Sequence, residues 1–150
     1  MTDYNLIRLK ELLNSNILSK NELCSNSVFI EVLVLLRDLV SKAEKINKKI
    51  VFDDYIDKKK LTFGTRDIHI NDITDLIKYF RDAAVHSHTV HRNNSVGGSL
   101  AFCKIFGKSQ SFGISSEFED DVCFVFGGVK LYLYRHIHRL TKELEDVLSQ

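Results

Sequence analysis

Residues 72–86, DITDLIKYFRDAAVH, contain the pattern that decides the fold of this chain. Five apolar residues recur there at helical spacing and share one face of a helix. These residues are Ile73, Leu76, Ile77, Phe80 and Ala84. Asn71 and Asp72 precede the pattern and Asp75 lies in its first turn, where polar and acidic side chains stabilise a helix N-terminus. The sequence therefore predicts an amphipathic helix that ends near His86.

Arg81, Asp82 and His86 bring three groups of chemical interest to the end of this helix. Arg81 borders the apolar face, so we expect its side chain to be held in a defined position. Alternatively, its aliphatic part covers apolar surface while the guanidinium reaches solvent, or it pairs with Asp82 or another acid. Asp82 and His86 are four residues apart, so the carboxylate can orient the imidazole. An arginine neutralises phosphate charge, and a histidine moves a proton near pH 7. Cleavage of RNA without a metal requires such groups.

The pattern Arg-x4-His, with an acid directly after the arginine, resembles the signature of the HEPN superfamily of helical ribonuclease domains. The resemblance implies a compact helical bundle, usually dimeric, in which two motifs meet across the dimer axis. It implies metal-independent RNA cleavage in many members and loss of catalysis in others. It assigns the chemistry to Arg81 and His86, with Asp82 accompanying them. It also implies a prokaryotic toxin or defence effector, often held by a partner antitoxin.

The spacing of Arg81 and His86 sets a geometric condition on such a site. The two residues are five apart, which is roughly 140° around an ideal helix. Their side chains converge only if the helix ends near His86 or if a second copy completes the site. A two-fold dimer meets this condition, because each motif then faces its twin. We therefore expect a homodimer.

Three histidines and an arginine cluster after the motif helix, at His86, His88, His91 and Arg92. We predict that His88 and Arg92 contact RNA. The alternative is a metal site. On a helix, however, only His88 and His91 share a face, and no nearby cysteine completes a zinc set. We therefore expect neither a metal nor another cofactor.

Residues 129–148 predict a final helix that follows Gly127 and Gly128. Apolar residues alternate there by four and three positions, as in a seam that packs against another helix. They are Leu133, Ile137, Leu140, Leu144 and Val147. Arg135 and Arg139 lie on the opposite face. They are predicted to hold RNA phosphates, and the alternative is a solvated face.

The remaining segments predict a single domain over residues 1–150 that is mainly α-helical. Two further helices are expected at 4–13 and 28–46, and the second is apolar around most of its circumference at its start, as in a central helix. A polar connector, or a basic loop that contacts RNA, is expected at 45–60. Apolar runs predict strands at 100–106, 110–114 and 122–126, the first two paired through a turn at 107–109. The expected fold is a HEPN-like helical bundle with a small antiparallel β insertion before the last helix.

The composition limits where in the cell the protein is expected to occur and which partners it is expected to bind. The net charge is only +1, so any contact with RNA must come from a local patch. The three cysteines form no CxxC pair, so we expect buried free thiols in a reducing compartment. The N-terminus lacks a basic region followed by an apolar core, and no apolar run approaches the ~18 residues of a membrane span. The sequence predicts a cytoplasmic protein without a membrane partner.

Two hypotheses for the function follow from these residues. The first is a metal-independent endoribonuclease that acts as a homodimer, with His86 as general acid or base, Arg81 as phosphate stabiliser and Asp82 as the residue that orients His86. The second is a non-catalytic helical interaction module that dimerises through the seam of the last helix. The near-neutral charge and the lack of a clear RNA-binding motif in the connector favour the second hypothesis.

Overall fold

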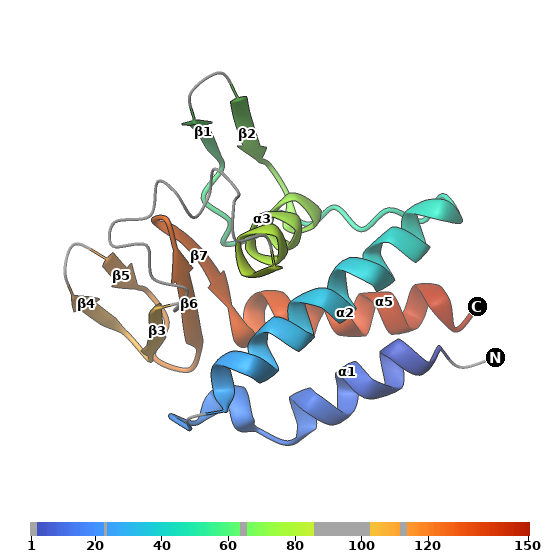
Figure 1. Ribbon diagram of the computed structural model, residues 1–150, viewed down its shortest axis with the longest axis horizontal. Helices are drawn as coiled ribbons and strands as arrows, with labels where there is room; N and C mark the ends of the chain where they lie inside the picture. The colour runs from blue at the N-terminus through green and yellow to red at the C-terminus, as the bar shows by residue number, and fades with distance from the viewer. Residues whose placement is uncertain (1–2, 23, 64–65, 86–102, 112–113) are drawn as a thin grey trace.

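The structure is a computed structural model that describes residues 3–22, 24–63, 66–85, 103–111 and 114–150. Helices and strands both contribute to it (Figure 1). The described helical elements are α1 (Tyr4–Asn14), the 3-10 turn η1 (Ile17–Ser19), α2 (Ser25–Lys45), α3 (Ile73–Val85), the π-helical segment η2 (Leu133–His138) and α5 (Arg139–Leu148). None of these helices is long and apolar enough to cross a membrane.

Antiparallel strands occupy two regions of the described chain. They are β1 (Lys59–Phe63), β2 (Arg66–Ile70), β3 (Cys103–Phe106), β4 (Ser109–Ser111), β5 (Ile114–Ser116), β6 (Val122–Phe126) and β7 (Val129–Tyr132). They form three sheets, ordered β1-β2, β3-β6-β7 and β4-β5. The prediction of a mainly helical bundle with a small β insertion is therefore wrong, and the fold is mixed α/β. One hairpin precedes α3, and the other strands lie between α3 and the last helix.

The β1–β2 hairpin follows the polar connector and projects from the body of the molecule (Figure 1). Leu61 pairs with Ile68 across the two strands. Thr62 and Lys60 both contact Asp67, at 3.0 and 2.9 Å. Apolar and polar residues alternate along both strands, a pattern typical of a half-buried hairpin. The sequence-based prediction missed this hairpin because it ended the segment at Gly64.

The predicted helix 129–148 begins later than expected, because its first four residues form β7. Gly127 and Gly128 have φ values of +56° and +74°. Positive φ at both central residues is the geometry of a two-residue hairpin turn, and Phe126 pairs with Val129 across it. The predicted pairing of 100–106 with 110–114 is also wrong. β3 pairs with β6 instead, and β4 pairs with β5.

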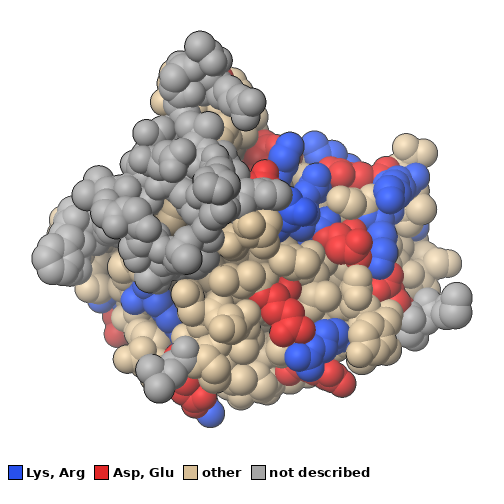
Figure 2. Space-filling view, viewed as in Figure 1, with Lys and Arg blue, Asp and Glu red and all other residues tan. Residues whose placement is uncertain are grey.

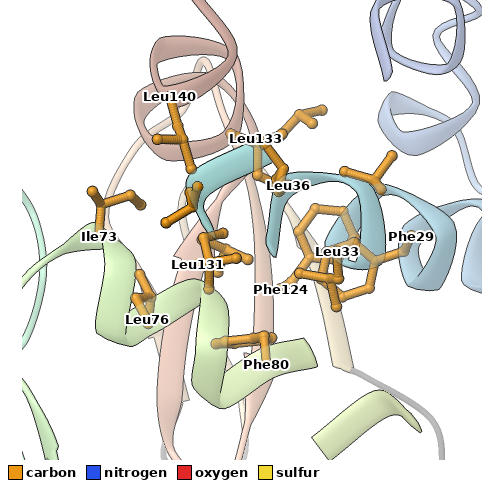
Figure 3. Close-up of a cluster of buried hydrophobic side chains, with 14 of the residues drawn as sticks. Phe29, Leu33, Leu36, Ile73, Leu76, Phe80, Phe124, Leu131, Leu133 and Leu140 are labelled. Carbon is orange, nitrogen blue, oxygen red and sulfur yellow. The ribbon is translucent and has the colours of Figure 1, made fainter. Parts of the chain in front are cut away.

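One hydrophobic core joins the helices to the β3-β6-β7 sheet (Figure 3). Its side chains come mainly from α1, α2, α3, β6, β7 and the last helix. The rings of Phe29 and Phe124 stack there with centroids 4.0 Å apart. The residues drawn and labelled are Phe29, Leu33, Leu36, Ile73, Leu76, Phe80, Phe124, Leu131, Leu133 and Leu140. The prediction of a central, largely apolar second helix is confirmed, since Phe29, Leu33 and Leu36 are all fully buried.

The apolar seam of the last helix belongs to this core and not to the surface. Leu133, Ile137, Leu140 and Leu144 are at most 2% exposed. They pack in the common core, where α5 meets α1 and α2 and η2 meets β6 and β7. These apolar residues are thus buried within one chain and are not available to a second copy. The predicted dimer interface along the seam is therefore wrong.

The three cysteines differ in exposure. The prediction of a buried free thiol is confirmed for Cys123 and is wrong for Cys24 and Cys103, which are free and exposed. Burial in the β3-β6-β7 sheet raises the pKa of the Cys123 thiol to about 12.

Candidate active site

Helix α3 holds Arg81 and Asp82 at the surface beside its buried face. The helix N-terminus is capped as predicted. Oδ1 of Asp72 accepts the N–H of Asp75 at 3.0 Å, and Oδ2 of Asp75 accepts the N–H of Asn71 at 3.1 Å. The predicted apolar face is buried in the core. Because this face fixes the rotation of the helix about its axis, it also fixes the direction in which Arg81 and Asp82 leave the helix.

Arg81 and Asp82 form an ion pair with each other. Nη1 of Arg81 lies 2.7 Å from Oδ1 of Asp82, and the two side chains are 34% and 24% exposed. The alternative interpretation of the sequence, in which Arg81 pairs with Asp82, matches this contact. The contact also keeps the guanidinium at the protein surface in a defined orientation.

A cleft of about 520 Å³ lies beside this ion pair, between α2 and α3. Its charged lining residues are Arg37 and Asp38 from α2, and Lys78, Arg81 and Asp82 from α3. Figure 2 shows Lys and Arg side chains gathered with Asp and Glu side chains over the region where Figure 1 draws these helices. The volume falls within the range of small-ligand sites, roughly 300–1,000 Å³. No pattern in the sequence indicates this cleft, because Arg37 is more than 40 residues away from Arg81 along the chain.

The carboxylate of Asp38 is contacted by two side chains that do not line the cleft. Nζ of Lys42 lies 2.7 Å from its Oδ2, and Nδ2 of Asn5 donates to the same atom at 2.6 Å. The hydrogen bond from Lys42 is the main reason that the pKa of Asp38 is held below its usual value. Asp38 is therefore an ionised carboxylate whose charge is partly offset by Lys42, which also pairs with Asp3 at 2.9 Å.

Three predicted site residues, His86, His88 and Arg92, lie outside the described residues. One described range ends at Val85 in α3, and the next begins at Cys103. The structure therefore brings together Arg81 and Asp82 from the motif. The proposed roles of His86, His88 and Arg92 stay predictions from the sequence.

Arg135 does not lie on a free basic face. Its guanidinium carbon is 3.7 Å from the ring centroid of Phe118, and its Nη1 lies 3.0 Å from Asp120 and 3.1 Å from Asp121. These contacts hold the acidic loop before β6 against the last helix. Nη1 of Arg135 and one face of its planar guanidinium are therefore occupied by its own chain.

Arg139 has a similar environment one helical turn later. It stacks 3.9 Å above the ring of Phe52 and lies 2.7 Å from Asp54 and 2.9 Å from Glu143. It thus fastens the connector before β1 to α5. Neither Arg135 nor Arg139 lines the cleft beside Arg81. The structure places the predicted phosphate-binding pair in ion pairs within the protein.

A buried carboxylate, Asp121, was not singled out in the sequence and organises the start of the last helix. Its Oδ1 accepts the N–H groups of Val122 and Tyr134 at 2.8 and 2.9 Å. Its Oδ2 accepts the N–H of Arg135 at 3.1 Å. It thereby satisfies two backbone donors in the first turn of η2, where a helix has no acceptors of its own. The sequence signal for this carboxylate is its position directly before an apolar strand.

His136 is buried beside this carboxylate and links two segments. Its Nδ1 accepts the N–H of Tyr132 at 3.0 Å, so its proton is on Nε2, which donates to the backbone oxygen of Asp54 at 3.0 Å. Burial lowers the pKa of His136 below its usual value. Both ring nitrogens are occupied by backbone groups, so this histidine has a structural role.

Comparison of the chain with protein-family models, curated proteins and solved structures finds no match. The case for a function therefore rests on the chemistry of the residues that line the cleft.

Proposed function

We propose that the protein is a metal-independent endoribonuclease whose active site lies at the cleft between α2 and α3. The observation that carries this proposal is the position of Arg81. It lines an open cleft together with two other cations, Arg37 and Lys78, and is 34% exposed there. Arginine presents a planar fork of donors that matches phosphate oxygens. His86 follows Arg81 by five positions in the sequence.

The proposed reaction uses the nucleophile that RNA carries itself. A general base removes the proton from a 2′-hydroxyl, the oxygen forms a bond to phosphorus, and the bond to the 5′-oxygen breaks as that oxygen receives a proton from a general acid. His86 serves as one of these two proton-transfer groups, a contribution of typically ~10²–10⁴-fold. Arg81 stabilises the charge on the phosphate oxygens in the transition state. The products are a 2′,3′-cyclic phosphate and a 5′-hydroxyl.

The second proton-transfer group is supplied, in this proposal, by His86 of a second copy. The motif resembles that of the HEPN domains, and the resemblance implies a homodimer in which two motifs face each other. The same resemblance suggests a toxin or defence role, control by an antitoxin and a cytoplasmic location. These assignments depend on the motif alone, since the mixed α/β fold differs from the helical bundle expected for such domains.

The test is cleavage of mixed RNA in EDTA by the wild-type protein and by His86→Ala and Arg81→Ala, with the ends of the products mapped. Cleavage by the wild type that leaves cyclic phosphate ends, and its loss in both variants, is the expected result. His69→Ala, at an exposed histidine of β2, is the matched control and should cleave like the wild type. Circular dichroism checks that the variants fold. Unchanged cleavage in either motif variant overturns the mechanism.

A second candidate is a non-catalytic interaction module. The ion pair between Arg81 and Asp82 favours it, because a pair of this kind can serve structure alone. The intramolecular contacts of Arg135 and Arg139 favour it too, since they remove two predicted RNA contacts. Absence of cleavage by the folded wild-type protein would support this candidate. Its contact surface cannot be the buried seam of the last helix.

A further inference from the structure

We infer that Arg37 and Lys78 form a second phosphate subsite in the cleft, which holds RNA by a phosphate next to the one that Arg81 contacts. This inference rests on the proposed function, because it names how the same cleft binds its substrate. The sequence pattern drew attention to neither residue, since Arg37 lies in the central helix α2 and Lys78 precedes the motif.

The positions of the three cations fit two neighbouring phosphates. Lys78 and Arg81 are three residues apart on α3, so they share a face with their Cβ atoms roughly 5–6 Å apart. Arg37 reaches the same cleft from α2. The three side chains therefore approach a bound strand from two sides, and at most one of them needs to contact the phosphate that reacts.

Arg37 and Lys78 have donor capacity that the described protein does not use. Lys78 is exposed and forms no ion pair with any residue that the structure describes. Nη1 of Arg37 is buried and makes no hydrogen bond within the described ranges. It lies 3.7 Å from Oε2 of Glu44, which is beyond hydrogen-bond distance. The Arg37 side chain is 25% exposed and lines the cleft, so a rotation of its guanidinium would let it donate to phosphate oxygens there.

Each of the two carboxylates in the lining of the cleft contacts a cation, which reduces its repulsion of a bound phosphate. Asp38 is paired with Lys42 at 2.7 Å, and Asp82 is paired with Arg81 at 2.7 Å. Arg37 also contacts Glu44 at 3.7 Å, so Lys78 is the lining cation that has no carboxylate partner among the described residues. A subsite of this kind recognises the backbone of RNA and carries no base specificity.

The experiment measures binding of a non-cleavable RNA, in which every 2′-hydroxyl is methylated, by fluorescence anisotropy over a range of salt concentrations. Lys78→Gln should weaken binding roughly tenfold at low salt, because it removes a charged hydrogen bond. It should also reduce the slope of log K against log salt by about 0.7, the value for one phosphate contact on a single strand. Arg37→Gln should have a similar effect, and Lys78→Arg should restore most of the affinity.

Lys20→Gln is the matched control, since Lys20 is an exposed lysine before α2 that lines no part of the cleft. It should bind like the wild type. Loss of affinity and slope in Lys78→Gln and Arg37→Gln supports the subsite even if the wild type cleaves no RNA, in which case only the proposed function fails. Wild-type affinity and slope in Lys78→Gln overturn the subsite, even if cleavage depends on Arg81 and His86. The Lys78 side chain is exposed, so this variant does not depend on a buried contact for folding.

Discussion

Nε2 of His136 donates a hydrogen bond to the backbone oxygen of Asp54 at 3.0 Å and so joins the last helix to the connector before β1. The other ring nitrogen accepts the N–H of Tyr132 at 3.0 Å. This arrangement is possible only for the neutral ring, because a proton on Nδ1 would face the N–H of Tyr132. Two segments more than 70 residues apart along the chain thus depend on the protonation state of one buried histidine.

The protein should lose stability as the pH falls below about 6.5, the usual pKa of histidine in an unfolded chain. Burial lowers the pKa of His136 in the folded state, and it also lowers that of His138. The unfolded state therefore binds protons first. The stabilisation is complete above about pH 6.5 and is lost as the pH falls toward the folded pKa. Urea denaturation between about pH 8 and pH 5 measures this dependence.

Two variants assign the pH dependence to the buried ring. His136→Gln keeps a donor for the oxygen of Asp54 but does not titrate, so its free energy of unfolding should vary less with pH. His69→Gln, at an exposed position of β2, should retain the wild-type dependence. If the free energy of unfolding of His136→Gln falls with decreasing pH as steeply as that of the wild type, other groups cause the loss of stability at low pH.

Asp121→Asn should destabilise the protein by about 2–4 kcal/mol. The change removes the charge that two N–H groups of the last helix and Nη1 of Arg135 contact, and it places an amide donor among those donors. The control is Asp120→Asn, because the side chain of Asp120 is 77% exposed and pairs with the same arginine. Its effect should be no more than about 1 kcal/mol. Urea denaturation at neutral pH compares the two, and equal effects would contradict a capping role.

The pair of Arg81 and Asp82 should contribute little to stability. Both side chains are partly exposed, so Asp82→Asn should change the free energy of unfolding by at most about 1 kcal/mol. Arg81→Lys keeps a positive charge but loses the planar fork of donors, so RNA cleavage should fall about a hundredfold while the fold persists. Denaturation and cleavage are measured on the same preparations. A larger loss of stability with unchanged cleavage would assign the pair to structure.

The helices were predictable because their signals are local. For α3, the apolar face and the cap at Asp72 can each be identified within a few residues of sequence. The central position of α2 followed from its apolar residues around most of its circumference. The pairing of Arg81 with Asp82 could likewise be predicted from the sequence, because the contact between two adjacent residues does not depend on the rest of the fold.

The features that were missed depend on contacts between distant segments. Gly127 and Gly128 were interpreted as the start of a helix. Only the pairing of β6 with β7 shows that they form a hairpin turn. Asp121 caps a helix that begins 12 residues later, and Arg37 joins Arg81 only because α2 packs on α3. A pattern within one segment contains no information about such neighbours, so these residues emerged from the structure alone.

Gly127→Ala should destabilise the β6–β7 turn more than Gly128→Ala does. Both glycines have positive φ, at +56° and +74°, so either alanine strains the backbone by about 1 kcal/mol. A Cβ on Gly127 would also lie 2.4 Å from Oη of Tyr79, whereas one on Gly128 would meet only the Nζ of Lys59 at 3.9 Å. Tyr79 donates to the backbone oxygen of Phe126 at 3.2 Å, which limits its retreat. In a Tyr79→Phe background the Gly127→Ala penalty should therefore fall to that of Gly128→Ala, as measured by a double-mutant cycle of urea denaturation. An unchanged penalty would mean that the backbone strain, and not the approach of Tyr79, requires glycine at this position.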